Sequence, residues 1–205
     1  MKRLFDIILI TIFSPLLIAI FPAIAMIILI MDGRPILYSQ KRTGKDSVPF
    51  TMYKFRTMDS SSSEELHEEH YNELASGTKI EPSLDPSKPI RIENDVRITQ
   101  VGNFLRKTSL DELPNLINVL NGQMALVGPR PLVPYESKLY GRYEQIRNTT
   151  TPGITGLAQV QGRTDLSLQE RLYWDIEYIE QRTFLLDIII LIKTVTSVFQ
   201  KKGAI

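Results

Sequence analysis

The chain has 205 residues, of which 43% are hydrophobic, and its formal net charge is +1. A charge this close to zero gives no indication of a polyanionic partner, so we expect no nucleic acid. The absence of cysteine excludes disulfides, thiolate metal sites and cysteine nucleophiles. The length is enough for one domain with a sizeable core.

The N-terminal segment contains an apolar run from Ile7 to Met31 without a charged residue. As a helix it would be about 37 Å long, which exceeds the roughly 30 Å of a bilayer's hydrocarbon core. No small-residue cleavage site closes the run, which argues against a signal peptide. Pro15 and Pro22 predict a kink, because proline removes a backbone donor, and Ser14 could hydrogen-bond a backbone group freed in this way.

The flanks of the apolar run are basic on both sides. The residues are Lys2 and Arg3 before it, and Arg34, Lys41, Arg42 and Lys45 after it. Basic residues concentrate on the cytoplasmic side of a membrane. The pattern therefore suits a re-entrant hairpin that enters and leaves by one face, but a kinked spanning helix fits the same residues.

The middle of the chain predicts a small β element and a long insertion. Residues 36–38 and 50–53 are expected to form short strands around a turn at 43–46. Residues 59–95 combine serines, an acidic stretch and prolines, which predicts a solvated insertion. His67 and His70 in this insertion lack the HExxH spacing, which favours a solvated helix face over a zinc site.

The second half of the chain predicts helices over 101–120, 167–182 and 184–201, the first ending before Gly122. The last helix has a wide apolar face and a narrow polar stripe, which fits either the membrane interface or the core of a soluble domain. Residues 127–163 are rich in glycine, proline and arginine, a composition typical of ligand-binding loops.

The segment RKTSLDELP at 106–114 carries the main candidate chemistry. In a structural interpretation, Ser109 and Glu112 form a capping box, and acidic residues favour a helix start. In a chemical interpretation, the adjacent carboxylates of Asp111 and Glu112 can hold Mg²⁺, and a carboxylate can attack phosphorus to form an acyl phosphate. Basic side chains elsewhere could neutralise phosphate oxygens. The candidates are Lys54, Arg56, Arg130 and Arg163.

Five segments resemble the bacterial sugar transferase family, the monotopic polyprenol-phosphate phosphoglycosyl transferases. They are KRLFDI at the start, the Ser14-Pro15 break, YKFRTM at 53–58, the run RKTSLDELPNLINVLNGQMALVGPRP, and PGITGLAQVQGR at 152–163. The resemblance covers nearly the whole chain except about 60–94, and its long motifs are specific.

The resemblance implies a site as well as a fold. Asp111 is expected to be the nucleophile and Glu112 its catalytic partner, with Mg²⁺ at the pair. Lys54, Arg106 and Arg130 match the family's basic positions near the phosphates. The implied fold class is mainly α with a small β element (α+β). It has a re-entrant helix-break-helix over 1–33, interfacial amphipathic helices, and a catalytic domain over 34–205.

The implied reaction transfers a sugar phosphate from a nucleotide diphosphate sugar, expected to be a UDP-sugar, to undecaprenyl phosphate. It releases UMP and passes through a covalent phosphosugar on Asp111, as the first membrane step of a glycan assembly pathway. The implied location is the cytoplasmic face of the bacterial inner membrane, in contact with membrane lipid. A homodimer is compatible with these expectations.

Three departures from the family pattern are small: Asn115, Ala125 and Gln161 stand where Gln, Ser and Asn are common. None removes a reacting group. The chain is expected to be the catalytic core alone, without the extra transmembrane helices of larger relatives. Three rival functions remain: a scaffold without turnover, a hydrolase that uses water, and a soluble protein with an ordinary N-terminal anchor.

Overall fold

The computed structural model describes residues 2–59, 97–137, 140–141, 143–162 and 166–199. Helix α1 (Lys2–Met31) leads into an antiparallel hairpin of β1 (Leu37–Thr43) and β2 (Pro49–Phe55), joined by the short helix η1 (Lys45–Ser47). This confirms the predicted hairpin and its turn. The predicted insertion over 59–95, with His67 and His70, lies outside the described residues apart from Asp59.

The second half of the domain is mostly helical. Its elements are α3 (Gln100–Thr108), η2 (Leu110–Glu112), α4 (Asn115–Leu120), β3 (Ala125–Val127), α5 (Pro134–Ser137), α6 (Tyr143–Asn148), β4 (Gly153–Thr155), α7 (Leu157–Gln161), α8 (Leu168–Gln181) and α9 (Phe184–Phe199). Strands β3 and β4 pair in parallel. The described fold is therefore mostly helical with small two-stranded sheets, as predicted, although a break separates α3 from α4 within the helix predicted over 101–120.

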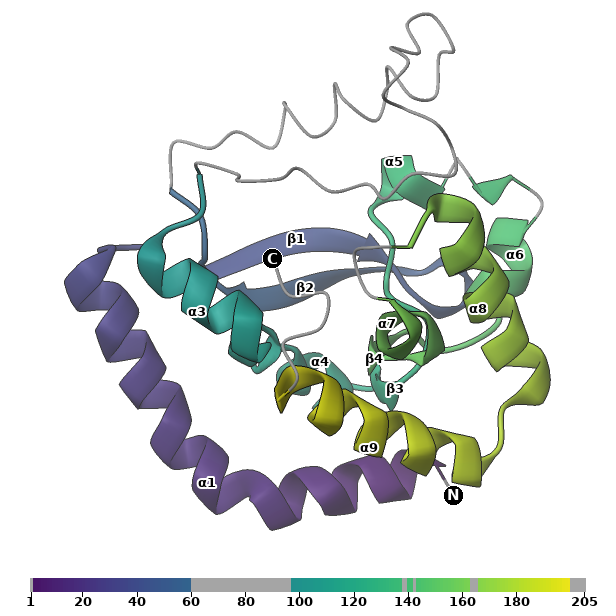
Figure 1. The fold of residues 1–205 in the computed structure, drawn as a ribbon, viewed down its shortest axis with the longest axis horizontal. Helices are drawn as coiled ribbons and strands as arrows, with labels where there is room; N and C mark the ends of the chain where they lie inside the picture. Colours follow the sequence, from purple (N-terminus) through teal and green to yellow (C-terminus); the bar gives the residue numbers. More distant parts are fainter. Residues whose placement is uncertain (1, 60–96, 138–139, 142, 163–165, 200–205) are drawn as a thin grey trace, which may run out of the picture.

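Helix α1 is continuous and bends along its length (Figure 1). It contains Pro15 and Pro22, and proline leaves the carbonyl four residues earlier without its helical donor. For Pro15 that carbonyl belongs to Thr11, and the Ser14 hydroxyl donates to it at 2.8 Å. The hydrogen bond predicted for Ser14 is therefore present, and the predicted break is a bend within one helix.

The surface of α1 is apolar and largely uncovered. Its length and composition would let it cross a membrane, and only 11% of its most apolar window is buried within the domain. Ile12, Leu16 and Ile18 are exposed on it. Because soluble proteins rarely expose contiguous apolar surface of this extent, α1 indicates association with a membrane.

The N-terminal end of α1 is fastened to the rest of the domain by polar contacts. The Lys2 ammonium donates to a carboxylate oxygen of Asp187 on α9 at 2.7 Å and to the hydroxyl of Tyr178 on α8 at 2.7 Å. The Arg3 guanidinium donates to the carbonyl of Leu120, at the end of α4, at 2.7 Å. The two basic residues that the sequence offered as a topology signal therefore also hold the helix in place.

The other end of α1 is held by apolar packing. Ile24 and Ile28 are buried with Phe55 of β2 and Leu105 of α3 in one hydrophobic cluster. Figure 1 shows the corresponding arrangement, with one end of α1 near α9 and the other near α3 and β1. Both ends of the apolar helix therefore contact the same domain.

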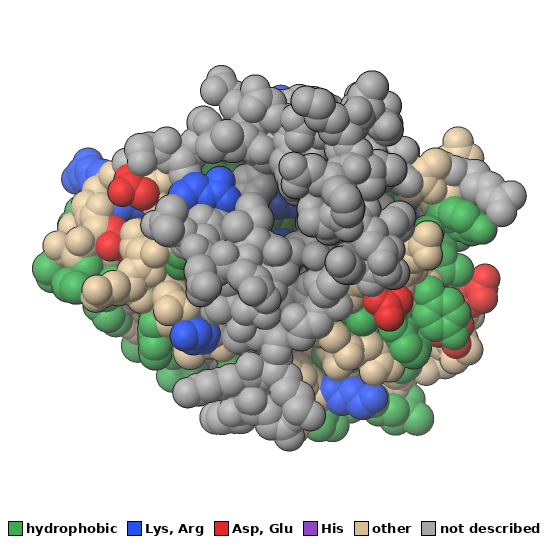
Figure 2. All heavy atoms as spheres, turned by 45° about the horizontal axis from the view of Figure 1, so that its top comes forward, with side chains coloured by type: hydrophobic (Ala, Val, Ile, Leu, Met, Phe, Trp, Pro, Cys, Tyr) green, Lys and Arg blue, Asp and Glu red, His purple; other side chains and the backbone are tan. Residues whose placement is uncertain are grey.

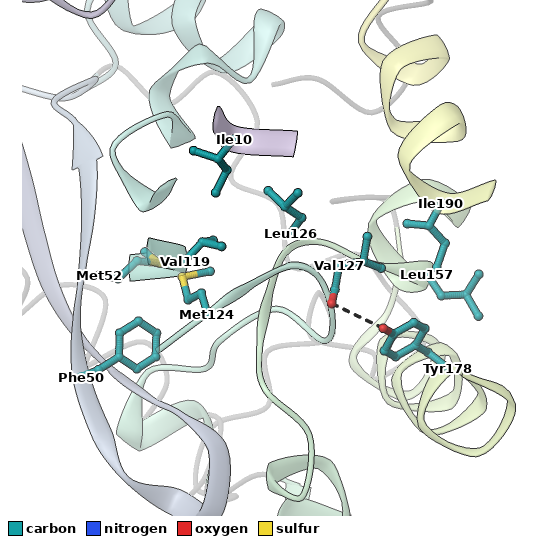
Figure 3. Close-up of a cluster of buried hydrophobic side chains, with 10 residues drawn as sticks. All are labelled: Ile10, Phe50, Met52, Val119, Met124, Leu126, Val127, Leu157, Tyr178 and Ile190. Carbon is teal, nitrogen blue, oxygen red and sulfur yellow. Dashed lines mark hydrogen bonds between the residues drawn. The ribbon is translucent and has the colours of Figure 1, made fainter. Parts of the chain in front are cut away.

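The main core joins elements that are distant in sequence (Figure 3). It contains Ile10, Phe50, Met52, Val119, Met124, Leu126, Val127, Leu157, Tyr178 and Ile190. The Tyr178 hydroxyl is satisfied inside this core, because it donates to Asp187 at 2.7 Å as well as approaching the Val127 carbonyl at 3.4 Å.

On the surface in Figure 2, acidic and basic side chains are interspersed, in agreement with the small net charge.

Helix α9 contributes to the core and also exposes apolar side chains. Ile190 and Asp187 are buried, and the hydroxyl of Thr194 hydrogen-bonds that of Thr155 on β4 at 2.7 Å. Leu185, Ile192 and Val195 are exposed on the same helix. Because a helix in water would rarely expose several large apolar side chains, this surface favours the membrane-interface interpretation of the outer face.

A close backbone contact sets the position of α3. Gly102 lies against the end of β2, where a β-carbon on it would come within 2.0 Å of the Thr57 carbonyl oxygen. Thr99 caps the same helix by accepting from the Gly102 N–H at 2.9 Å. Only glycine allows this approach, which brings α3 onto the hairpin.

We expect Gly102→Ala to lower the free energy of unfolding by about 2 kcal/mol or more, because the added methyl group must displace backbone. In a thermal melt this corresponds to a fall in Tm of roughly 5 °C. Asn103→Ala is the matched control, since Asn103 is the exposed neighbour on the same helix. Equal melting temperatures for the two variants would contradict the close contact.

Candidate active site

The acidic pair lies at a corner between two helices. Ser109 has a left-handed backbone (φ 56°) and ends α3, and Asp111 and Glu112 follow in the single turn η2. The Ser109 side chain makes no capping hydrogen bond, so the predicted capping box with Glu112 is wrong. The left-handed residue turns the chain sharply, which breaks the predicted helix and directs the two carboxylates toward the hairpin.

Lys54 of β2 contacts both carboxylates. Its ammonium donates to Glu112 at 2.6 Å and approaches Asp111 at 3.4 Å. Asp111 is 6% exposed, and the side chains of Lys54 and Glu112 are 16% and 18% exposed. Because carboxylates are seldom buried without a partner, the lysine makes it possible to hold two of them side by side.

Arg130 approaches the pair from the loop after β3. Its guanidinium lies 3.4 Å from the same Glu112 oxygen that Lys54 contacts, and its side chain is 46% exposed. A half-exposed guanidinium beside buried carboxylates can reach an anionic ligand from the solvent side. The structure therefore brings together Lys54, Asp111, Glu112 and Arg130, four of the residues predicted for the site.

The loop that carries Arg130 is held by two buried arginines that the sequence analysis did not identify. Arg147 donates to the carbonyl of Arg130 and pairs with Asp175 at 2.8 Å, with both side chains buried. Arg42 donates to the carbonyl of Pro131 at 3.1 Å. No spacing signal marks these residues, because each partner lies far away in the sequence.

The glycines of this region serve packing as well as flexibility. A β-carbon on Gly153 would lie 2.0 Å from the Gly128 nitrogen. The two backbones therefore touch beside the paired strands β3 and β4. At least part of the glycine content of residues 127–163, which predicted ligand loops, is required by this contact.

The other predicted basic residues lie in different surroundings. The Arg106 side chain donates to the Thr57 hydroxyl at 2.9 Å, and its charge acts to lower the pKa of Asp111. Arg56 is buried and donates at 2.7 Å to the Arg34 carbonyl and at 3.0 Å to the Gly33 carbonyl, just after α1. Arg56 thus braces the exit from the membrane helix. The predicted Arg163 lies outside the described residues.

The pKa values of the two carboxyl groups are shifted in opposite directions. Burial raises the pKa of Asp111. The positive charge of Lys54 acts to lower this pKa, and the negative charge of Glu112 acts to raise it further. Burial also acts to raise the pKa of Glu112, but the charges of Lys54 and Arg130 outweigh it and lower this pKa to about 2. Glu112 is therefore firmly ionised at neutral pH. Such divergent pKa shifts within one pair are typical of functional sites.

The donor set fits a divalent cation that shares its coordination with a ligand. Among the described residues, Lys54 and Arg130 contact the pair through Oδ2 of Asp111 and Oε1 of Glu112. The other oxygen of each carboxylate could therefore coordinate a cation. In the described part of the chain, no three acidic or histidine side chains lie together in a way that could hold a metal ion. Mg²⁺ is commonly bound through one or two carboxylates together with substrate phosphates, so two donors are sufficient.

An apolar pocket of about 170 Å³ opens beside the acidic pair. Its lining combines the corner with α4, β3, β4 and α9. The residues are Ser109, Glu112, Leu113, Leu116, Leu126, Ile154, Thr155, Leu191 and Thr194. The sequence analysis did not identify this pocket, because its walls come from four separate segments.

Comparison with known proteins identifies relatives over the full chain. A family model described as bacterial sugar transferase matches residues 1–201. The undecaprenyl-phosphate galactose phosphotransferase of Salmonella typhimurium is 41% identical over 100% of this chain. The UDP-glucose:undecaprenyl-phosphate glucose-1-phosphate transferase of Escherichia coli is 34% identical, also over 100% of it. The exopolysaccharide production protein ExoY of Rhizobium meliloti is 35% identical over 99% of it.

The extent of these matches differs between relatives. The chain spans 41% of the length of the Salmonella and Escherichia proteins, and 87% of the length of the Rhizobium protein. The family match runs from residue 1 to residue 201, so it includes helix α1, the acidic pair and the loop that carries Arg130.

We expect Lys54→Met to destabilise the protein by roughly 3 kcal/mol at pH 7, because it leaves two buried carboxylates without their main partner. Glu112 has a pKa of about 2 against an ordinary 4.5, so its stabilising contribution is complete above pH 4.5 and lost as the pH falls toward 2. The difference in Tm between the natural protein and the variant should therefore be largest at neutral pH and shrink below about pH 4.5.

The control is Lys45→Met, because Lys45 is an exposed lysine near the same hairpin and lies 4.0 Å from Asp46. It should change Tm little at any pH. A Tm difference for Lys54→Met that stays constant from pH 7 to pH 3 would show that Lys54 acts through packing and not through the carboxylates.

Proposed function

Because the chain belongs to the bacterial sugar transferase family, we propose that it transfers a sugar phosphate from a UDP-sugar to undecaprenyl phosphate. The observation that carries the proposal is the Asp111–Glu112 pair, held by Lys54 and Arg130 within a domain whose helices α1 and α9 expose apolar faces. The name of the Escherichia relative combines UDP-glucose with undecaprenyl phosphate, and that of the Salmonella relative combines galactose with undecaprenyl phosphate.

In the first step, a carboxylate oxygen of Asp111 forms a bond to the phosphorus next to the sugar. The bond from that phosphorus to the oxygen bridging toward uridine breaks, and UMP leaves with the electron pair. A phosphosugar remains on Asp111 as an acyl phosphate. The raised pKa of Asp111 suits this role, because burial makes its charged form more reactive toward a bound electrophile.

In the second step, a phosphate oxygen of undecaprenyl phosphate forms a bond to the same phosphorus. The bond to Asp111 breaks, which restores the carboxylate and releases undecaprenyl diphosphate sugar. Glu112 stays ionised next to Lys54 and Arg130, so it keeps both basic groups oriented throughout. Two successive displacements spare the site from holding three large anions together.

Mg²⁺ is the proposed cofactor, and the second oxygens of Asp111 and Glu112 would hold it together with the diphosphate of the donor. Bound there, it would neutralise the charge on the diphosphate oxygens during transfer. Lys54 already contacts both carboxylates and offsets part of their negative charge. The cation is therefore expected to bind most strongly when the donor brings its own negative charge.

The contacts of α1 support a re-entrant arrangement at the cytoplasmic face. A helix that crosses the bilayer delivers its two ends to opposite sides. Here Lys2 contacts Asp187 and Tyr178, whereas Ile28 packs with Phe55 on the hairpin, so both ends contact one domain. The basic residues on both flanks agree with a helix that returns to the cytoplasmic side.

We expect Asp111→Asn to abolish both UMP release and the formation of lipid-linked sugar, because the amide cannot form the acyl phosphate. The assay uses protein in lipid nanodiscs with Mg²⁺, undecaprenyl phosphate and a panel of UDP-sugars. Asp46→Asn is the matched control, since Asp46 is exposed on the η1 turn and should keep full activity. Thermal melts establish that both variants are folded.

Three results would decide against parts of this proposal. Full activity of folded Asp111→Asn would refute the covalent mechanism. UMP release that continues beyond one equivalent without a lipid acceptor would indicate a hydrolase. Activity retained after removal of divalent cations by a chelator would refute the role of Mg²⁺.

We expect a membrane-impermeant maleimide to reach both ends of α1 from the same side. The chain has no cysteine, so single cysteines can be placed before Met1 and at the exposed Arg34 without further changes. Both should be labelled in inverted inner-membrane vesicles and protected in intact spheroplasts. Labelling of the two positions from opposite sides would show a spanning helix.

A further inference from the structure

The pocket beside the acidic pair has a lining that is apolar apart from its edge at the carboxylates. Glu112 and Ser109 lie at one end, and Leu113 and Leu116 line it from the η2–α4 side. Leu191 contributes to the wall from α9. The pocket thus extends from Glu112, the neighbour of Asp111, into the apolar part of the domain.

The two threonines of the lining do not make this wall polar. The hydroxyls of Thr155 and Thr194 lie 2.7 Å apart, and one of them donates to the other. The Thr194 hydroxyl is also placed 2.8 Å from the Ile190 carbonyl, within its own helix. Their hydrogen-bonding capacity is engaged inside the protein, so the methyl groups and leucines dominate what a ligand would meet.

The size of the pocket corresponds to a small hydrocarbon group. Its volume is about 170 Å³. An apolar protein cavity of about 150 Å³ accommodates a molecule of the size of benzene. The pocket therefore matches a branched hydrocarbon unit of about five or six carbons. It is too apolar to bind a nucleoside or a sugar well, because their hydroxyl groups would lose water without gaining hydrogen-bond partners.

The wall formed by α9 leads from the pocket to the proposed lipid surface. Leu191 lines the pocket, and the next residue, Ile192, is 60% exposed on the apolar outer face together with Leu185 and Val195. A hydrocarbon chain that starts in the pocket could therefore leave it past α9 and meet exposed apolar side chains on the way to lipid. A water-soluble donor has no need of such a path.

We propose that this pocket binds the first isoprene unit of the polyprenyl phosphate acceptor and thereby directs its phosphate to Asp111. The inference rests on the proposed function, because it assigns the acceptor of that reaction to a specific subsite. The isoprene unit next to the phosphate fills the pocket. The phosphate lies beside Glu112, where Lys54 and Arg130 are close, and the rest of the polyprenyl chain lies in the membrane. Glu112 at the pocket edge repels a phosphate that enters too deeply, and Lys54 and Arg130 attract it at the correct depth.

The first experiment measures binding alone and does not depend on turnover. The probe is farnesyl phosphate with a diazirine on the isoprene unit next to the phosphate, photolysed with the natural protein in nanodiscs. We expect mass spectrometry to find the label on peptides from α4, β4 and α9, and undecaprenyl phosphate to compete with it. Labelling confined to α1, or no labelling above that of heat-denatured protein, would overturn the proposal.

The second experiment separates the acceptor from the donor. Leu191→Phe adds bulk inside the pocket, whereas Ile189→Phe adds the same bulk at an exposed position of the same helix outside the pocket lining. We expect Leu191→Phe to raise the KM for undecaprenyl phosphate at least fivefold more than the KM for the UDP-sugar. Ile189→Phe should change the ratio of the two constants less than twofold.

The outcomes distinguish the subsite from the reaction. A larger rise in the KM for the UDP-sugar would assign the pocket to the donor and overturn the proposal, as would equal ratios in the two variants. If Leu191→Phe fails to fold, the photolabelling of the natural protein still decides. If the natural protein shows labelled α9 but no turnover with any donor, the proposed reaction fails while the isoprenoid subsite stands.

Discussion

The ionic contact between Lys54 and the two carboxylates is the interaction on which the rest of the site depends. Two adjacent acidic side chains at 9% and 18% exposure would repel each other and lose hydration without a compensating cation. Lys54 comes from the central part of the domain, whereas the carboxylates come from a turn more than fifty residues later. The contact therefore fixes the hairpin, the left-handed turn at Ser109 and the Arg130 loop relative to one another.

The same domain meets two solvents, and its helices are arranged accordingly. Helix α1 exposes apolar residues over most of its length, and α9 buries Asp187 while it exposes Leu185, Ile192 and Val195. This distribution would be unfavourable in water, but it is the expected one at a lipid surface. The acidic pair contacts Lys54 of the hairpin, and Glu112 shares a pocket with Leu191 of α9, so the proposed water-soluble donor and lipid-bound acceptor could meet there.

Local patterns in the sequence predicted local structure well. The hairpin depends on short strands around a turn, and the helix beginning at Leu168 has a complete capping box formed by Ser167 and Glu170. The sequence analysis predicted a capping box only at the similar pattern of Ser109 and Glu112, and that prediction was wrong. There the glutamate is engaged by Lys54, a partner that no local pattern could reveal.

The candidate site was predictable only in part, for a related physical reason. The family motifs identified Asp111, Glu112 and Arg130, because reacting groups are read directly from such motifs. The buried arginines that hold the Arg130 loop could not be found in this way, because Arg147 and Arg42 act through backbone carbonyls, and any residue supplies a carbonyl. Their role follows from burial and distance, which only the fold provides.

The contact between Lys2 and Asp187 has a consequence for biosynthesis, because it joins positions 185 residues apart. A ribosome exposes the apolar helix long before it has made the acidic residue that fastens it. During that interval the N-terminal end of the helix can be held by lipid but not by Asp187, and closure of the domain must await the last helices. Insertion into the membrane would then precede completion of the domain, so that the acidic pair would take its final surroundings at the surface that holds the proposed lipid acceptor.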